Sequence, residues 1–387
     1  MTVPGQIRGI RVRGEVIDQR IANLSIESSR PLSATMVLTG RPVAEALKLV
    51  PLLFPVCGRA QVIAGVRAAE AAMGRHPDPV TEAARDLLVL AEQCAGIAWR
   101  IEIDWALLCR RSPDATTVAA VRESAQEVRF ALFGDLPFDQ IGAAPVKVDR
   151  VRLLMALALL QARLASLFPE ALQADGLMDL ELAMAKGRSI PARLVHAARL
   201  QPDAALGNHD RDYFDEKCPM WFGDRLGADG NFPWLPTIDG RTAEVGPLAG
   251  MRHDLVVEAL VGWGAGLATR LLAASLDVFT VPTRMQELTR RIVDGLPMGR
   301  SARLGEGTGS GIAETARGPL AHWVRVDGDR VIDWRAVAPT EWNFHPQGPF
   351  VRALARARAL SDPEHQIRVL AASFDPCVPV TVDLVRA

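Results

Sequence analysis

The spacing of apolar residues predicts a mainly helical chain. Apolar side chains recur at three- and four-residue steps, the pattern of amphipathic helices, over residues 43–51, 61–73, 80–108 and 151–168. The same reading predicts further helices at about 252–276, 283–294 and 349–360. The sequence His-Pro-Asp-Pro at 76–79 breaks the pattern, so we expect a turn before the long stretch that follows it.

Strands are predicted in fewer places, where apolar and polar residues alternate. Alternation occurs over residues 10–16 and again at 36–38. Residues 322–334 read HWVRVDGDRVIDW, which predicts a hairpin with Asp-Gly at its turn. Residues 201–250 are rich in Gly, Pro, Asp and aromatic residues, so we expect an irregular segment there. The residues from 369 to 385 are expected to be extended.

The composition narrows the classes of protein to consider. The 387 residues are 49% hydrophobic with a formal net charge of −1, which argues against a nucleic-acid-binding protein and its usual basic excess. Residues 153–164 and 255–281 are apolar but carry charged residues, so we interpret both as buried core helices and expect no membrane insertion. The N-terminus lacks the apolar stretch of a signal peptide. Five cysteines without a CxxC pair favour a cytoplasmic protein over a secreted disulfide framework.

Five groups of short motifs, in a fixed order along most of the chain, carry a resemblance. They are FPVC at 54–57 with VRAAE at 66–70, EVGPLA at 244–249, ETARG at 314–318 followed by Leu320 and His322, PTEWN at 339–343, and SFDPC at 373–377. Together they resemble the motifs of the [NiFe]-hydrogenase large subunit. The resemblance implies a shortened form of that fold, mainly α with small β additions, as a single domain over residues 1–387. N-terminal strands would lie in 1–40, a helical core in 42–300, and a C-terminal hairpin and metal-site segment in 301–387.

The sequence departs from that family at the metal-binding cysteines. In the large subunit, two CxxC pairs hold nickel and iron, with one cysteine of each pair on nickel alone and the other bridging both metals. Here Phe54 stands at the nickel-only position of the first pair, and Val380 stands at the bridging position of the second. Cys57 and Cys377 remain. The resemblance therefore implies too few thiolates to hold nickel, and no nickel is expected.

Two thiolates still suffice for part of the family's metal centre. An iron that carries one carbon monoxide and two cyanides has three of its six coordination positions free, and thiolates suit such an iron. By the resemblance, Arg317 and Thr340 match the residues that donate hydrogen bonds to cyanide in the family. Asp375 and Asp104 match aspartates near its metal site. Histidines of the family are replaced by Gln61, four residues after the first cysteine, and by Asp383 near the C-terminus.

These features resemble hydrogenase accessory proteins of the HupK/HoxV type. The resemblance implies a non-enzymatic assembly scaffold that transiently carries the Fe(CN)2(CO) fragment. It would receive the fragment from a chaperone of the HypC type, or its complex with HypD, and pass it to the apo large subunit. The chain stops four residues after Asp383, so we expect none of the C-terminal processing by which large subunits lose a tail.

Other functions remain open on the sequence alone. The chain is alternatively a divergent [NiFe]-hydrogenase-like oxidoreductase subunit, or a metal-free interaction protein on the same fold. Cys57 and Cys377 are alternatively plain buried cysteines or partners in a disulfide. We interpret Cys94, Cys109 and Cys218 as structural.

Two segments have polar patterns that resemble ligand sites. Residues 305–311 read GEGTGSG but lack the GK[ST] of a nucleotide-binding loop, so we interpret them as a glycine turn. An acidic loop contains His209, Asp210, Asp212, Asp215, Glu216 and Cys218. Its spacing matches no zinc pattern, which favours a solvated loop or a partner-binding surface.

Overall fold

The computed structural model describes residues 9–28, 34–142, 145–203, 206–208, 212–214, 216–294, 299–355 and 357–386. Helices make up most of it, which confirms the predicted fold class. The α-helices are α1 (Val43–Leu53), α2 (Gly58–Ala72), α3 (Pro79–Trp99), α4 (Ala106–Leu108), α5 (Ala115–Phe133), α6 (Arg150–Ala165), α7 (Leu177–Lys186), α8 (Ile190–Arg199), α9 (Pro219–Ala228), α10 (Pro247–Gly250), α11 (Asp254–Gly262), α12 (Leu267–Asp294), α13 (Pro339–Asn343), α14 (Pro349–Ala355) and α15 (Pro363–Ser373).

Shorter turns and two small sheets complete the architecture. The 3-10 helices are η1 (Ala34–Leu38), η2 (Pro55–Cys57) and η4 (Pro169–Gln173), and a π-helical turn, η3 (Arg100–Trp105), joins α3 to α4. The strands are β1 (Ile10–Ile17), β2 (Arg20–Ser28), β3 (Ser301–Gly305), β4 (Thr308–Thr315), β5 (Gly318–Asp327), β6 (Arg330–Val337) and β7 (Val380–Arg386).

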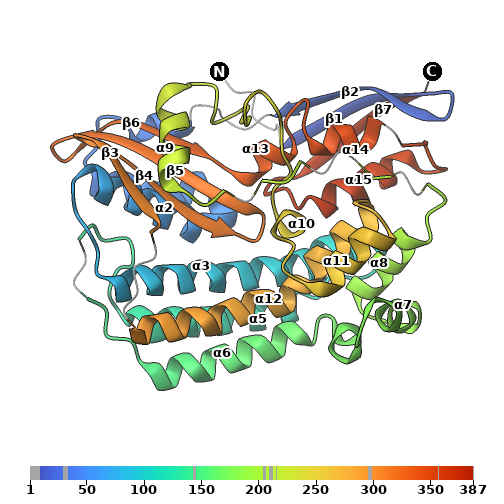
Figure 1. Ribbon diagram of the computed structural model, residues 1–387, viewed down its shortest axis with the longest axis horizontal. Helices are drawn as coiled ribbons and strands as arrows, with labels where there is room; N and C mark the ends of the chain where they lie inside the picture. The colour runs from blue at the N-terminus through green and yellow to red at the C-terminus, as the bar shows by residue number, and fades with distance from the viewer. Residues whose placement is uncertain are drawn as a thin grey trace.

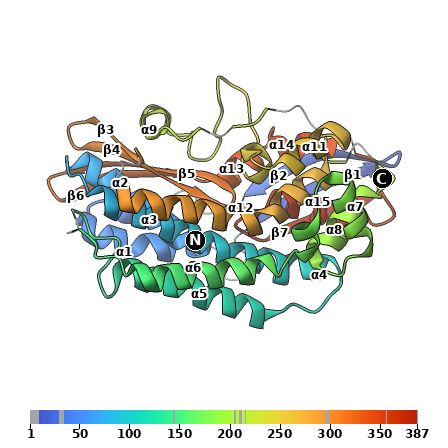
Figure 2. The same ribbon diagram turned by 60° about the horizontal axis from the view of Figure 1, so that its bottom comes forward.

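Four long helices form one layer of the molecule. α3 packs against α5 and α12, and α6 packs against α5 and α12, so the four run side by side along the lower half of Figure 1. Shorter helices α7, α8 and α11 gather around one end of α12 (Figures 1 and 2). Aspartate side chains cap the N-termini of three of the long helices, Asp78 for α3, Asp114 for α5 and Asp149 for α6, by accepting backbone N–H bonds.

The larger sheet lies between α2 and α9. Its antiparallel strands are ordered β3-β4-β5-β6, and α2 runs along β4 and β5. Successive residues of β4 face opposite sides, as pleating requires. Gly311 faces α2, where a Cβ would lie 2.5 Å from backbone atoms of Ala64 and Ala68. Ser310 faces the other way and donates a hydrogen bond to the carbonyl oxygen of Pro219 at the start of α9 (2.6 Å). The glycine-rich segment 305–311 is therefore a turn and a strand packed closely on a helix.

The smaller sheet joins the two ends of the chain. Its order is β2-β1-β7, with β1 antiparallel to β2 and parallel to β7. Ile10 lies opposite Val380, so the segment that follows Cys377 is anchored on the N-terminal strand. The hairpin predicted over 322–334 is confirmed as β5 and β6, which turn at Gly328 with φ +58°.

Four details of the predicted elements are wrong. Residues 36–38 belong to the 3-10 helix η1 rather than to a strand. The break expected before residue 283 lies instead between α11 and α12, where Gly264 has φ +80°, and Pro282 is inside α12. Residues 369–373 continue α15 before the chain becomes extended, and α9 and α10 lie within the segment expected to be irregular.

Among the described residues, no single helix has the length and apolar character needed to cross a membrane. One pair of consecutive segments, Val43–Leu53 and Pro55–Ala72, passes the same test of length and composition when joined, but it is bent by 102°.

Candidate functional site

Cys57 lies at the corner between α1 and α2. The chain turns by 102° there, and Cys57 is the residue that precedes the first turn of α2. Its side chain is half-buried, and its sulfur accepts a hydrogen bond from Nε2 of Gln61, one turn further along α2 (3.5 Å). The N–H groups at the start of α2 do not serve the sulfur, because the Glu92 carboxylate of α3 accepts those of Arg59 and Ala60 (both 2.9 Å).

Cys377 lies on the loop between α15 and β7. The loop leaves the helix through Asp375, whose φ of +48° is in the left-handed region that Asp tolerates better than most residues. The backbone N–H of Cys377 donates to Oγ1 of buried Thr340 (3.3 Å), and that hydroxyl donates in turn to the Cys377 sulfur (3.2 Å). Thr340 thus holds both the backbone and the sulfur of Cys377.

The two cysteines, 320 positions apart, face the same space. Both are free thiols. Burial, and after it the negative charges of Cys377 and Glu92, raises the pKa of Cys57 to about 12, whereas the Gln61 hydrogen bond and the charge of Arg317 act in the opposite direction. These effects require Cys57, Cys377 and Arg317 to lie within electrostatic reach of one another.

Arg317 is anchored on the loop that carries Cys377. Its Nε donates to the carbonyl oxygen of Asp375 (2.8 Å), and its Nη2 donates to Oδ1 of the same residue (3.2 Å). Within the described part of the chain, its Nη1 has no hydrogen-bond partner. The charges of Asp375, Cys377 and Cys57 raise the pKa of Arg317 and outweigh the opposing effect of its burial. Arg317 is therefore a fixed cation with one unused donor group beside two sulfurs.

A second arginine fixes Asp375 from the opposite side. Arg100, in the π-helical turn η3, is 1% exposed, and its Nη1 donates to Oδ2 of Asp375 (3.0 Å). Its Nη2 donates to the carbonyl oxygen of Ala274 (2.6 Å) and to Asp277 (3.2 Å) of α12. Asp375 thus ties η3, the turn between β4 and β5, and the cysteine loop together.

Three of the sequence motifs, EVGPLA, ETARG and PTEWN, pack on one another around this site. Gly246 of EVGPLA has φ +110°, and a Cβ there would lie 3.1 Å from the carbonyl oxygen of Arg317. Gly318, next to Arg317, has φ +121° and packs equally closely on Val245. The side-chain amide of Asn343, in PTEWN, accepts from the N–H of Val245 (3.0 Å) and donates to its carbonyl oxygen (3.1 Å). The two glycines are required for this close approach.

Asp104 lies at the edge of the site. It is in η3 and is exposed, yet partial burial of the carboxyl and the nearby charge of Asp375 raise its pKa to about 6. Arg317 opposes that shift. π-helical turns are frequent at functional sites, and this one presents both Asp104 and Arg100 to the same loop.

Phe54 and Val380 stand at the two positions where the motif resemblance implies further cysteines. The Phe54 ring packs edge-on against the buried His322 ring, with centroids 6.4 Å apart. Val380 begins β7 and pairs with Ile10. Asp383 lies further along the same strand and forms an exposed ion pair with Arg11 (3.4 Å).

Further polar groups surround the site: Glu92 and Arg100, which the motif comparison did not single out, and His322 and Gln61, which it named. Glu92 and Arg100 are charged residues within the apolar pattern of 80–108. Charged residues are seldom buried without a partner, so their place in this pattern could have identified them from the sequence. His322 accepts at Nδ1 from Nε1 of Trp334 (2.9 Å), and its Nε2 lies 2.7 Å from Oε1 of Gln61. Burial lowers the pKa of His322 to about 3, so the ring is neutral.

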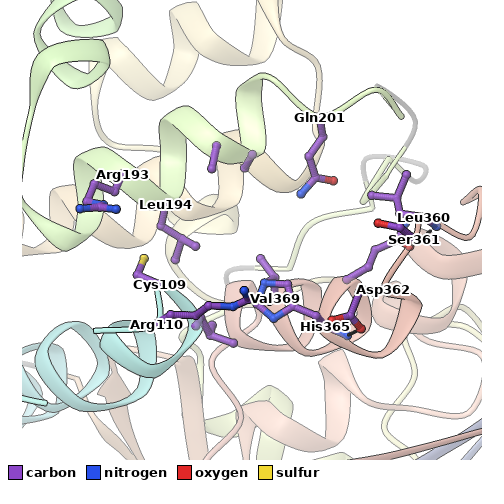
Figure 3. Close-up of a pocket in the computed structure, with 14 residues that line it drawn as sticks. Cys109, Arg110, Arg193, Leu194, Gln201, Leu360, Ser361, Asp362, His365 and Val369 are labelled. Carbon is purple, nitrogen blue, oxygen red and sulfur yellow. Dashed lines mark hydrogen bonds between the residues drawn. The ribbon is translucent and has the colours of Figure 1, made fainter. Parts of the chain in front are cut away.

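Away from the cysteines, a cavity of about 360 Å³ lies between α8, α15 and the end of α4 (Figure 3). Arg193 and Gln201 border it on one side and His365 on the other, and none of Cys57, Cys377 and Arg317 lines it. The remaining cysteines are buried in α3 (Cys94), half-buried at this cavity (Cys109) and exposed before α9 (Cys218).

The acidic loop is described only in part. His209, Asp210 and Asp215 lie outside the described residues. Glu216 accepts the backbone N–H groups of Lys217 and Cys218 (2.8 and 2.7 Å). Throughout the described ranges, no group of three or more His, Cys, Asp or Glu residues is arranged to hold a metal ion.

Known proteins resemble this chain in sequence and in fold. Residues 252–383 match the family described as nickel-dependent hydrogenase. The hydrogenase expression/formation protein HupK of Bradyrhizobium diazoefficiens is 31% identical over 382 residues, which cover 95% of this chain and 94% of the relative. The hydrogenase expression/formation protein HoxV of Cupriavidus necator is 28% identical, with 94% of this chain and 93% of the relative covered.

Among solved structures, the [NiFeSe] hydrogenase of Desulfomicrobium baculatum matches with a TM-score of 0.63 at 15% identity, covering 94% of this chain and 95% of that chain. The fold is that of a hydrogenase large subunit, as the motifs predicted.

Proposed function

We propose that this chain, which belongs to the family of hydrogenase expression/formation proteins that includes HupK and HoxV, is a maturation scaffold that transiently carries the Fe(CN)2(CO) fragment. It receives the fragment from a HypC-type chaperone, alone or in complex with HypD, and passes it to the apo large subunit. Nickel is not part of the cargo. The relatives' names support a role in hydrogenase formation, and the arrangement of the site supports this cargo.

One observation carries the proposal: two free thiols from opposite ends of the chain share electrostatic contact with Arg317. Thiolates are the ligands that a low-spin iron accepts, and two of them fill two of the three positions left by one carbon monoxide and two cyanides. The guanidinium of Arg317 offsets part of the negative charge that two thiolates and two cyanides would place in this pocket.

The donors of the site match a cyanide-bearing cargo. Arg317 uses Nε and Nη2 on Asp375, so Nη1 is available to donate a charge-assisted hydrogen bond to a cyanide nitrogen. The hydroxyl of Thr340 donates to the Cys377 sulfur in this structure. A hydroxyl hydrogen rotates to suit its surroundings, so Thr340 can redirect it to a second cyanide while still accepting the Cys377 N–H.

The partial exposure of the two cysteines suits release of the iron fragment as well as its binding. Cys57 and Cys377 are half-buried rather than enclosed, and Leu52 and Val56 beside Cys57 are exposed apolar residues, 75% and 54% accessible. A partner that docks on this surface would reach the sulfurs directly. Phe54 and Val380, which cannot ligate a metal, leave the cargo without the additional thiolates that would hold nickel beside it.

Infrared spectroscopy tests the proposal. The protein is purified anaerobically from cells that produce the maturation machinery, and the cyanide and carbon monoxide stretching bands are recorded. We expect these bands in the unaltered protein and in Cys218→Ala, whose sulfur is exposed and outside the site. Cys57→Ala and Cys377→Ala should lack them.

The same preparations distinguish the alternatives. Hydrogen-dependent dye reduction by the pure protein would indicate a divergent hydrogenase. Hydrogenase maturation that proceeds normally with both cysteines replaced by alanine would indicate a metal-free interaction protein. Either result would overturn the scaffold role.

A further inference from the structure

Three buried side chains form a hydrogen-bonded row that ends on the Cys57 sulfur. Trp334 of β6, His322 of β5 and Gln61 of α2 are 2%, 0% and 1% exposed. The indole Nε1 of Trp334 lies 2.9 Å from Nδ1 of His322, and Nε2 of His322 lies 2.7 Å from Oε1 of Gln61. Nε2 of Gln61 lies 3.5 Å from the Cys57 sulfur.

The direction of every hydrogen bond in this row follows from its first member. An indole N–H is a donor only, so Nδ1 of His322 must accept from Trp334. A neutral imidazole that accepts at Nδ1 carries its hydrogen on Nε2, and that hydrogen is donated to the neighbouring Gln61 atom. The neighbour must therefore be the amide oxygen of Gln61, which directs the amide nitrogen and its N–H at the Cys57 sulfur.

We infer that Gln61 is a positioning residue whose N–H, aimed by His322 and Trp334, is held permanently on the sulfur of Cys57. Reversal of the Gln61 amide would place an NH2 group against the Nε2–H of His322, two donors face to face in a buried site. Nothing in the row requires a change of protonation, since an amide and an indole do not titrate in the physiological range. The donor to the sulfur is thus present whether the site is empty or loaded.

The inference deepens the proposed function and rests on it where it concerns the iron fragment. An N–H donor on a thiolate withdraws electron density that the sulfur would otherwise donate to the metal, and it fixes the direction of the sulfur's lone pairs. Once the Thr340 hydroxyl turns from the Cys377 sulfur to a cyanide, Cys57 keeps its donor and Cys377 does not, so Cys57 would be the weaker electron donor of the two sulfurs. The carbon monoxide stretch of a bound fragment reports this density, because a more electron-rich iron weakens the carbon–oxygen bond.

The empty protein provides a test that needs no iron. In protein labelled with ¹⁵N-histidine, the ring nitrogens of His322, assigned by their absence in His322→Asn, should show a single tautomer with the hydrogen on Nε2. In Trp334→Phe, which lacks the indole donor, the signals should move toward a mixture of tautomers. A hydrogen on Nδ1 in the unaltered protein would overturn the inference.

The loaded protein provides the second test. Gln61→Leu removes the N–H, and Gln61→Glu keeps an oxygen for His322 but presents no amide N–H to the sulfur. In both variants the carbon monoxide band should shift to lower wavenumber. Gln366→Leu is the matched control, because Gln366 is also buried (3%) and its side chain, among the described residues, bonds backbone groups alone, those of Leu360 and Arg358. Its bands should not move.

Failure of the two proposals can be told apart. If the unaltered protein shows no cyanide or carbon monoxide bands, the proposed cargo is wrong, and the histidine tautomer still decides whether the row is directed. If the bands are present but Gln61→Leu and Gln61→Glu leave them where they were, the role of Gln61 is wrong and the scaffold role stands.

Discussion

Loss of the Asp375 charge should destabilise the protein, because this carboxylate is the shared anion of one buried and one partly buried arginine. Its side chain is 8% exposed, against 1% for Arg100 and 14% for Arg317. Removing one partner of a buried ion pair typically costs about 3–5 kcal/mol, since it leaves an uncompensated charge. Arg100 keeps Asp277 and a backbone carbonyl, whereas Arg317 keeps only the carbonyl oxygen of residue 375.

The expected cost of Asp375→Asn is therefore at the lower end of that range, about 3 kcal/mol. Asn retains an oxygen that can accept one arginine N–H, and like Asp it tolerates the φ of +48° at this position. Asp375→Ala loses both properties. We expect it to be less stable than Asp375→Asn by about a further 1 kcal/mol.

Urea unfolding followed by tryptophan fluorescence measures both variants, with the midpoint compared at unchanged slope. Glu364→Gln is the control, since its pair with Arg368 is exposed and should be worth less than about 1 kcal/mol. The reasoning is refuted if Asp375→Asn unfolds at the midpoint of this control. In addition, Arg317→Met combined with Asp375→Asn should cost at least about 1 kcal/mol less than the sum of the single changes.

Three further predictions concern packing, pH and proton release. Gly311→Ala should cost about 3 kcal/mol of stability, because its Cβ would lie 2.5 Å from the backbone of α2. Gly305→Ala, with no atom within 4 Å of its Cβ, should cost less than about 0.5 kcal/mol in the same urea assay. Burial lowers the pKa of His322 from 6.5 to about 3, so the unfolded chain takes up this proton first as the pH falls. The stability that neutral His322 contributes is complete above pH 6.5 and should be lost by up to about 1.4 kcal/mol per pH unit between pH 6.5 and 3. As the pH falls, the urea midpoint of His322→Gln should decrease less steeply than that of the unaltered protein. Equal dependence of the two midpoints on pH would contradict the lowered pKa of His322. Because burial and the charge of Cys377 raise the pKa of Cys57 to about 12, Cys57 is a thiol near pH 7 and must lose its proton to bind a metal. Zn²⁺ affinity, measured by calorimetry in two buffers, should rise about tenfold per pH unit for each proton displaced. An affinity independent of pH, or one that Cys57→Ala leaves unchanged, would refute this.

The apolar pattern predicted most of the helices because it is a local property of the chain. The helix starts at Asp78 and Asp114 follow from side chains that cap their own neighbouring N–H groups. The prediction errors arose where a local sequence pattern is compatible with two different secondary structures. Pro282 was compatible with a break or with a place inside a long helix, and packing of α12 along α3 and α6 decided for the helix.

The sequence motifs predicted, by resemblance, which residues form the site. The structure brings these residues together: Cys57, Cys377, Arg317, Thr340 and Asp375. Their roles toward a metal fragment stay predictions. The reason that they converge is visible only in three dimensions. Gly246 packs on the Arg317 backbone, for example, and Asn343 bonds Val245, although these segments are far apart in the chain.

The sequence by itself predicted the large-subunit fold, which the structure confirms, and through the family resemblance it predicted that one cysteine remains from each of two metal-binding pairs. Both predictions rest on the order of residues along the chain. Only the tertiary structure decided that Arg100 holds Asp375, that Glu92 occupies the first N–H groups of α2, and that Gln61 turns its amide toward Cys57. The first two are contacts between segments brought together by folding. The third is a contact within one helical turn, but its direction is set by His322, which folding brings to the Gln61 oxygen, so it too depends on packing that no local pattern records.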